Sequence, residues 1–125
     1  MARGCNDGAM SELERLHTNQ RMSQAVIHGD IIYLAGQVAA DDSADVAGQT
    51  QQILAAIDRL LAEAGSDKTQ ILMATIWLSD IASFGAMNEV WDAWVPAGCG
   101  PARACVESRL ATPAYKVEIR VVAAR

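Results

Sequence analysis

The feature that most constrains the fold is an amphipathic segment followed at once by an apolar one. Residues 45–67 carry apolar side chains at helical spacing along one face: Val46, Ile53, Leu54, Ile57, Leu60, Leu61 and Ala64. This pattern predicts a helix with one buried face. Asp45 or Asp42 is its candidate N-cap, and Gly65 stands where a left-handed residue ends a helix. Residues 70–80, QILMATIWLSD, are almost entirely apolar, which predicts a strand covered on both faces.

Two strands are expected before this helix and strand, and a second helix is expected after them. Residues 24–41 predict two strands joined by an HGD turn. Gly36 interrupts the second strand, which is typical of a bulge or of a close approach of the backbone to a ligand. Residues 83–95 predict a helix capped by Ser83. Its apolar side is expected to carry Phe84, Met87, Trp91 and Trp94.

Two further strands, at 101–110 and 115–124, complete an element order of β-β-α-β-α-β-β. Short connections between strands and helices predict an α+β fold, in which a mixed sheet carries both helices on one face. A chain of 125 residues suits a single domain, and its 51% hydrophobic content can supply a core. The other sheet face keeps apolar residues, among them Val122 and Ala124, so we expect a symmetric homo-oligomer to cover it.

The composition argues against several classes of partner. The net charge is −5 and no run of basic residues occurs, whereas nucleic-acid binding depends on clustered Lys and Arg. No stretch approaches the roughly 20 apolar residues that a membrane span needs. His17 and His28 are far apart in the chain, so the sequence predicts no metal site.

The cysteines and the N-terminus bear on location. Cys5, Cys99 and Cys105 have no paired spacing, which predicts reduced thiols and a cytoplasmic protein. The first ten residues, MARGCNDGAM, lack an apolar signal core and are expected to form a disordered tail. Residues 11–125 are then the domain, and the sequence leaves open whether translation starts at Met1 or Met10.

Arg103 is the first candidate for chemistry. In a strand it shares a row with Cys105 and Glu107, while Ala102, Ala104 and Val106 form the opposite row, which is expected to pack. Two readings remain open for the arginine. It is either a solvated or internally paired charge on an edge strand, or an anchor that binds a small carboxylate through two parallel hydrogen bonds.

Four other residues are candidates for the site, and two of them, Glu118 and Cys105, have both a structural and a functional reading. Glu118 is either paired with an arginine across the sheet or placed to activate a water. Cys105 reads more readily as a packed thiol than as a nucleophile, because no histidine is expected near it. Gly36 leaves a backbone N–H unobstructed for an oxyanion, and Asn88 lies one step off the apolar stripe of its helix. Trp91 and Trp94 are expected in the core.

The sequence from about residue 13 to 125 resembles the YjgF/RidA family, the reactive-intermediate deaminases. The resemblance runs through five stretches: RMSQAVIHGDIIYLAGQV, QTQQILAAIDRLLAEAGSD, TIWLSDIASFGAMNEVWDAWV, PARACVE and YKVEIRVVAA. PARACVE, followed by the last strand with its glutamate, is the specific part. WDAWVPAGCGPAR is similar to a side branch with a tryptophan-rich second helix.

The resemblance implies a chorismate-mutase-like fold and a homotrimer with three sites between subunits. It also implies hydrolysis of imines such as 2-iminopropanoate, the tautomer of 2-aminoacrylate, to a 2-oxo acid and ammonia, without a metal or an organic cofactor. Carried over by position, Arg103 would bind the substrate carboxylate and Glu118 would lie near the attacking water. Gly36, Asn88 and Cys105 would line the pocket.

Two positions depart from the family pattern. Met22 stands where a tyrosine is common, and Ala35 stands where Ser or Thr is common. Both changes remove hydroxyl groups from the implied pocket. A second reading is therefore a module that binds 2-oxo acids or similar carboxylates without turnover. A third, a ribonuclease or translation inhibitor, is disfavoured by the acidic composition.

Overall fold

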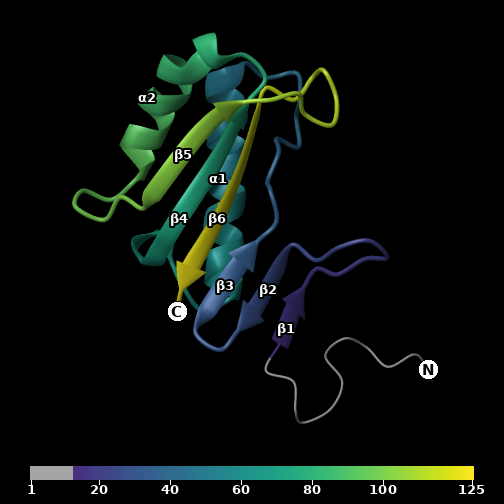
Figure 1. The fold of residues 1–125 in the computed structure, drawn as a ribbon, viewed down its shortest axis with the longest axis vertical. Coiled ribbons are helices and arrows are strands. Elements are labelled where there is room, and N and C mark those ends of the chain that lie inside the picture. Colours follow the sequence, from purple (N-terminus) through teal and green to yellow (C-terminus); the bar gives the residue numbers. More distant parts are fainter. Residues whose placement is uncertain (1–12) are drawn as a thin grey trace.

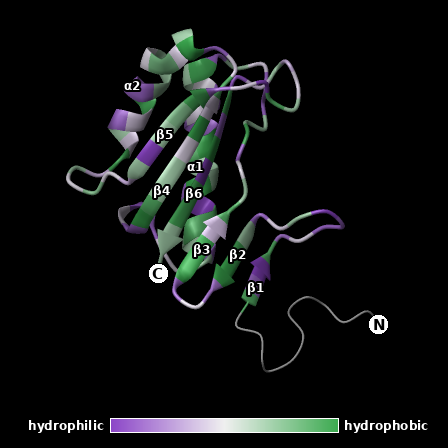
Figure 2. Ribbon diagram, in the orientation of Figure 1, coloured by the Kyte–Doolittle hydropathy of each residue, from purple (hydrophilic) through white to green (hydrophobic). Residues whose placement is uncertain are grey.

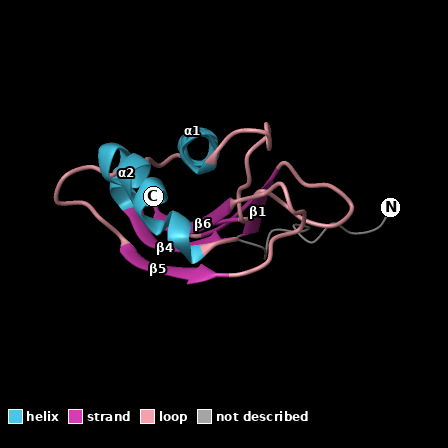
Figure 3. Cartoon of the chain, turned by 90° about the horizontal axis from the view of Figure 1, so that it is seen from above, coloured by secondary structure: helices cyan, strands magenta, loops and turns pink. Residues whose placement is uncertain are grey.

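The computed structural model describes residues 13–125, so the expected tail at 1–10 lies outside the described residues. Six strands form one sheet, and both helices cover the same face of it (Figures 1 and 3). The strands are β1 Leu13–Leu16, β2 Ala25–His28, β3 Ile31–Leu34, β4 Ile71–Leu78, β5 Ala102–Glu107 and β6 Val117–Ala124. The helices are α1 Val46–Glu63 and α2 Phe84–Trp94. The expected α+β fold with a mixed sheet and two helices on one face is confirmed.

The order of strands across the sheet is β1-β2-β3-β6-β4-β5. Only β4 and β5 run parallel, and α2 connects them, as a crossover between parallel strands requires. The C-terminal strand β6 lies between β3 and β4 and is therefore central. Strands β1 and β5 form the two edges of the sheet (Figure 1). Arg103 belongs to β5.

The core lies between the sheet and the two helices. Alternate residues of β6 point into it, namely Val117, Ile119, Val121 and Ala123. The apolar stripe of α1 meets them from the other side, and Ile53, Ile57 and Leu61 are fully buried. Asp45 caps α1 by accepting a hydrogen bond from the Gly48 N–H, and Gly65 adopts a positive φ of 85° just beyond the helix. Figure 2 shows the hydrophobic residues along β2, β4 and β6.

Several sequence expectations need correction. One strand that the sequence did not predict, β1, precedes the two expected strands β2 and β3. Its four residues, Leu13–Leu16, carry no strand pattern of their own and become a strand by pairing with β2. Ser83 does not cap α2 through its side chain. Instead, Asp80 accepts from the Ala82 N–H and starts a 3₁₀ turn, Ile81–Ser83, that leads into the helix.

The burial expected from the sequence is also wrong for β4, β5 and Phe84 in the single chain. Strand β4 is buried on one face only, and Met73 on its other face is 45% exposed. On β5 the row of Ala102, Ala104 and Val106 is exposed rather than packed, because α2 lies over the opposite row. Phe84 lies 41% exposed at the start of α2, so it is not part of the core.

Candidate active site

Arg103 lies on the helix-covered face of the edge strand β5. Its Cα partner on β4 is Ala74, which is buried under the helices, so the Arg103 side chain points the same way. There it meets α2: its Nη1 donates a hydrogen bond of 2.8 Å to Asn88 Oδ1. The central carbon of the guanidinium lies 5.2 Å from the centre of the Trp91 ring and 5.8 Å from that of Phe84. Phe84, Asn88 and Trp91 are spaced i, i+4 and i+7, so one side of α2 supplies all three.

No acidic residue neutralises this guanidinium within residues 13–125. The nearest candidate by sequence, Glu107, is engaged elsewhere, since its Oε2 accepts a hydrogen bond of 3.0 Å from the Ile81 N–H. Arg103 therefore keeps a positive charge that is exposed and held on one side by aromatic rings and an amide. The internally paired reading of this arginine is wrong for the single chain.

Cys105 lies on the same row as Arg103 and packs partly against the core. Burial raises the pKa of its thiol, and the positive charge of Arg103 offsets this rise only in part. A raised pKa keeps the sulfur protonated near neutral pH, and a protonated thiol is a poor nucleophile. The geometry thus favours the packed-thiol reading.

Glu118 and Gly36 meet at a second place, on the uncovered face of the sheet. Glu118 is paired with Trp77 across the β4–β6 ladder, on the row that points away from the helices. A Cβ built on Gly36 would overlap Glu118 Oε2. The Glu118 carboxylate therefore occupies the space that a side chain at position 36 would take.

The Glu118 carboxylate also has no cationic partner in the described part of the chain. The nearest arginine on its row, Arg120, instead lies over the Trp77 ring, with 5.8 Å between the guanidinium carbon and the ring centre. The reading in which Glu118 pairs with an arginine across the sheet thus finds no support among residues 13–125. Partial burial raises the pKa of Glu118, which brings its titration closer to neutral pH. A carboxyl group of this kind is suited to proton transfer.

Ala35 directly precedes Gly36, whereas Met22 lies in the loop between β1 and β2. The Ala35 N–H donates to the Gln24 carbonyl at 2.9 Å, which places Ala35 beside the end of the loop that contains Met22. Met22 is exposed and its N–H donates to Asn19 Oδ1. Neither side chain brings a hydroxyl group to the vicinity of Gly36.

The candidate residues therefore form two separate groups. Arg103, Asn88 and Cys105, with Phe84 and Trp91, form the guanidinium group on the helix-covered face of β5. Gly36 and Glu118 form the carboxylate group on the uncovered face, near the centre of the sheet. The sheet itself lies between them, so one chain does not bring Arg103 and Glu118 into a single pocket.

Trp91 and Phe84 are the residues of this region that sequence reasoning missed. Helical spacing predicts both in the core, which is confirmed for Trp91 and wrong for Phe84, and it gives neither a contact with Arg103. The available signal was that Asn88 lies between them at steps of four and three, which puts all three on one side of the helix. The sequence did not show that this side faces Arg103, because the contact joins residues far apart in the chain.

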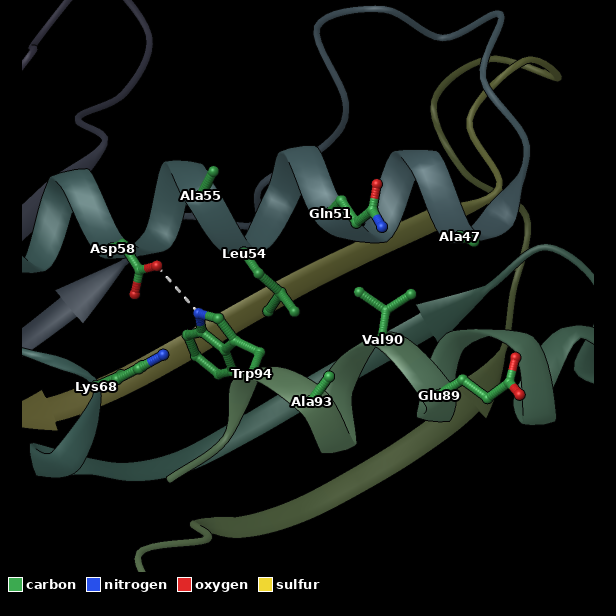
Figure 4. A pocket seen from close by; sticks show the side chains of 10 residues that line it. All are labelled: Ala47, Gln51, Leu54, Ala55, Asp58, Lys68, Glu89, Val90, Ala93 and Trp94. Carbon is green, nitrogen blue, oxygen red and sulfur yellow. Dashed lines mark hydrogen bonds between the residues drawn. The ribbon is translucent and has the colours of Figure 1, made fainter. Parts of the chain in front are cut away.

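A separate groove of about 590 Å³ lies between the two helices (Figure 4). Trp94 lines it and donates its indole N–H to Asp58 Oδ2 at 3.0 Å, while the Lys68 ammonium lies 5.3 Å from the Trp94 ring centre. None of the residues of the guanidinium group or the carboxylate group lines this groove. Over residues 13–125, no cluster of three or more His, Cys, Asp or Glu could hold a metal ion. No helix in the same range is long and apolar enough to cross a membrane.

Comparison with known proteins places this geometry in a family. The model of the family described as endoribonuclease L-PSP matches residues 12–125. A RutC family protein of Haemophilus ducreyi is 46% identical over 112 residues, covering 90% of this chain and 96% of the relative. The rat protein named 2-iminobutanoate/2-iminopropanoate deaminase is 33% identical over 107 residues, covering 81% and 77%.

The solved structures agree with the sequence comparison. A crystal structure of a YjgF family member from Neisseria meningitidis has a TM-score of 0.88 and 48% identity, covering 90% of this chain and 94% of that one. The family model spans residues 12–125 and therefore includes β5 with Arg103 and β6 with Glu118. The chain belongs to the endoribonuclease L-PSP family, also called the YjgF/RidA/RutC family.

Proposed function

We propose that this protein hydrolyses small imines derived from amino acids to 2-oxo acids and ammonia. The observation that carries the proposal is the exposed Arg103 guanidinium, held by Asn88 and two aromatic rings without a carboxylate partner in the described chain. A planar guanidinium binds a carboxylate in a fixed orientation through two hydrogen bonds. The rat relative, named for 2-iminobutanoate and 2-iminopropanoate deamination, supports this choice of substrate class.

The site is proposed to form between two copies in a homotrimer. Arg103 and Glu118 point to opposite faces of the sheet, so a pocket that uses both needs Arg103 from one copy and Glu118 from another. The uncovered face carries exposed apolar side chains, including Tyr33, Met73 and Val106, which favour burial against a second copy. A closed cyclic trimer would then hold three equivalent sites.

The proposed reaction uses few groups. Arg103 holds the carboxylate of the imine, and a substrate that arrives as the enamine first tautomerises. A water beside Glu118 attacks the imine carbon, and Glu118 accepts the proton that the water loses. The C–O bond forms as the C=N π bond becomes a lone pair on nitrogen. Glu118 then returns this proton to the nitrogen, which gives a neutral carbinolamine. Glu118 next accepts the proton of the carbinolamine hydroxyl and passes it to the amine nitrogen. The electron pair of the O–H bond forms the C=O bond, the carbon–nitrogen bond breaks, and ammonia leaves with formation of the 2-oxo acid. Orientation of the water and the imine supplies the acceleration.

The test is ammonia release from 2-iminobutanoate generated in the assay by an amino-acid oxidase. We expect Arg103→Ala to lower the catalysed rate at least about 100-fold, because the substrate loses its charged hydrogen bonds. The variant should keep the oligomeric state of the wild type. Arg59→Ala removes an exposed arginine on α1, outside both residue groups, and serves as the matched control with unchanged rate. Wild-type ammonia release no faster than in buffer would refute the proposal.

A second candidate function is carboxylate binding without turnover. Met22 and Ala35 favour it, because neither supplies a hydroxyl group near Gly36. Such a module would show a rise in melting temperature with 2-oxobutanoate that depends on Arg103, but no release of ammonia from imines. Substituting Met22→Tyr together with Ala35→Ser would separate the two: a gain of hydrolysis in the double variant alone would favour the binding module for the natural chain.

A further inference from the structure

The aromatic surroundings of Arg103 go beyond what carboxylate binding by an arginine requires. One of the two N–H groups on its Nη1 donates to Asn88 Oδ1 at 2.8 Å. The guanidinium is planar, and Nη2 shares with Nε the edge that lies away from Nη1. Two parallel hydrogen bonds to a carboxylate can form along this edge. The Asn88 contact uses no donor of this edge, so the Nε and Nη2 N–H groups both remain for a ligand.

Trp91 restricts the same group in another direction. Its ring is 4% exposed and is held in place by the core, so it is a rigid surface rather than a mobile one. The guanidinium carbon lies 5.2 Å from the centre of this ring, within the range of a cation–π interaction. Phe84 lies at 5.8 Å, although it is more exposed. An arginine side chain has several rotatable bonds, and each contact removes part of that freedom before a ligand arrives.

We propose that Trp91 is a positioning residue, which together with Asn88 holds Arg103 with its Nε and Nη2 edge open to the ligand carboxylate. This inference rests on the proposed function only for the identity of the ligand as a small 2-oxo or imino acid. Trp91 touches no ligand in this arrangement. It acts through the arginine, so its loss should weaken binding more than it slows the chemical step.

Trp94 offers a matched control on the same helix. Its ring centre lies 5.3 Å from that of Trp91, and it is also partly buried against the core. Its polar contact is with Asp58 of α1, on the side of α2 that faces the interhelical groove, as Figure 4 shows. Replacing Trp94 therefore damages the packing of α2 without touching Arg103.

The experiment compares Trp91→Leu, Trp91→Phe and Trp94→Leu in the full-length protein, with 2-oxobutanoate as the probe. Binding is measured by calorimetry and by the ¹H–¹⁵N signal of Arg103 Nε. We expect Trp91→Leu to raise the Kd about 3- to 10-fold, since it keeps an apolar side chain but removes the ring face. Trp91→Phe should raise it less than about 3-fold because an aromatic face remains. Trp94→Leu should change the Kd less than about 2-fold while lowering the melting temperature.

A variant outside the core keeps the test decisive if Trp91→Leu fails to fold. Asn88→Ala removes the hydrogen-bonded contact of the arginine from a half-buried position, and we expect it to raise the Kd about 5- to 10-fold. Equal increases in Kd for the Trp91 and Trp94 variants would show that Trp91 acts only through packing and would overturn the inference. A wild-type protein that does not bind 2-oxobutanoate would overturn it as well. Binding that depends on Trp91 without hydrolysis of imines would refute the proposed reaction alone.

Discussion

At the scale of single residues, the contact between Gly36 and Glu118 is the tightest constraint in the candidate site. A methyl group at position 36 would overlap Glu118 Oε2, and this atom is the free end of a flexible side chain. Position 36 has no positive φ, so alanine is compatible with its backbone. A substitution by alanine is therefore expected to move the Glu118 carboxylate and to leave the backbone fold unchanged.

Gly36→Ala is expected to displace the Glu118 carboxylate toward solvent at a stability cost below about 1.5 kcal/mol. The rate of imine hydrolysis should fall at least about 10-fold, because the water loses its proton acceptor. Burial raises the pKa of Glu118, so a more exposed carboxylate should titrate lower. The acid limb of the pH–rate profile should then move to lower pH, which steady-state rates across the pH range can measure.

The same variant made in a Glu118→Gln background provides the control for this prediction. If Gly36 acts through Glu118, adding Gly36→Ala should lower the rate of the Glu118→Gln enzyme only slightly further. Independent, additive losses would contradict the proposed link between the two residues.

At the scale of elements, the buried amide of Gln49 ties helix α1 to two loops. Its Nε2 lies 3.0–3.2 Å from the carbonyl oxygens of Asp42, Ala44 and Ala114 and can donate to them. Its Oε1 accepts from the Lys116 N–H at 2.9 Å. Lys116 directly precedes β6, so this single side chain fixes the entry into the strand that carries Glu118.

Gln49→Met is expected to lower the free energy of unfolding by about 2–4 kcal/mol, because it keeps the volume but leaves buried backbone groups without partners. Urea unfolding at one protein concentration measures the change. Gln51→Met, an exposed position on the same helix, is the matched control and should stay within about 0.5 kcal/mol of the wild type. Similar effects of both substitutions would show that the amide bonds of Gln49 add nothing.

At the scale of the whole molecule, the sheet separates the guanidinium group from the carboxylate group. Arg103 faces α2 at one edge, whereas Glu118 faces away from the helices in the centre. The proposed pocket therefore depends on how copies of the chain meet. Two inactive variants, each lacking one of these residues, should therefore restore activity when they assemble together, which a site within one chain would not allow.

Equal amounts of Arg103→Ala and Glu118→Gln chains, unfolded and reassembled together, should regain activity that neither variant has alone. In a cyclic trimer each site takes Arg103 from one copy and Glu118 from its neighbour. Random assembly makes about three quarters of the trimers mixed, each with one intact site in three, so about one quarter of wild-type activity should return. Ammonia release from 2-iminobutanoate measures the recovery.

The order of mixing supplies the control for this experiment. Variants assembled separately and then combined should stay inactive for as long as their subunits do not exchange. No recovery after joint reassembly, although mixed oligomers have formed, would contradict a pocket shared between copies.

The sequence by itself determined the long helix, the last strand and the side of each that is buried. The spacing in residues 45–67 defined α1, with Asp45 as its cap and Gly65 beyond its end, because helix periodicity and end signals are local properties. Alternation likewise defined β6 and showed that Glu118 lies on the row opposite the core. Gly36 stands out in the sequence because it interrupts a strand pattern, which is also a local signal.

Only the tertiary structure decided what these residues meet. Strand β1 forms because β2 offers it a partner, which a four-residue stretch does not reveal by its own pattern. The burial of the Arg103 row, rather than the Ala102 row, depends on which side of β5 lies under α2. Period-two alternation separates the two faces of a strand but does not say which of them is covered, since that is fixed by contacts between residues distant in the chain.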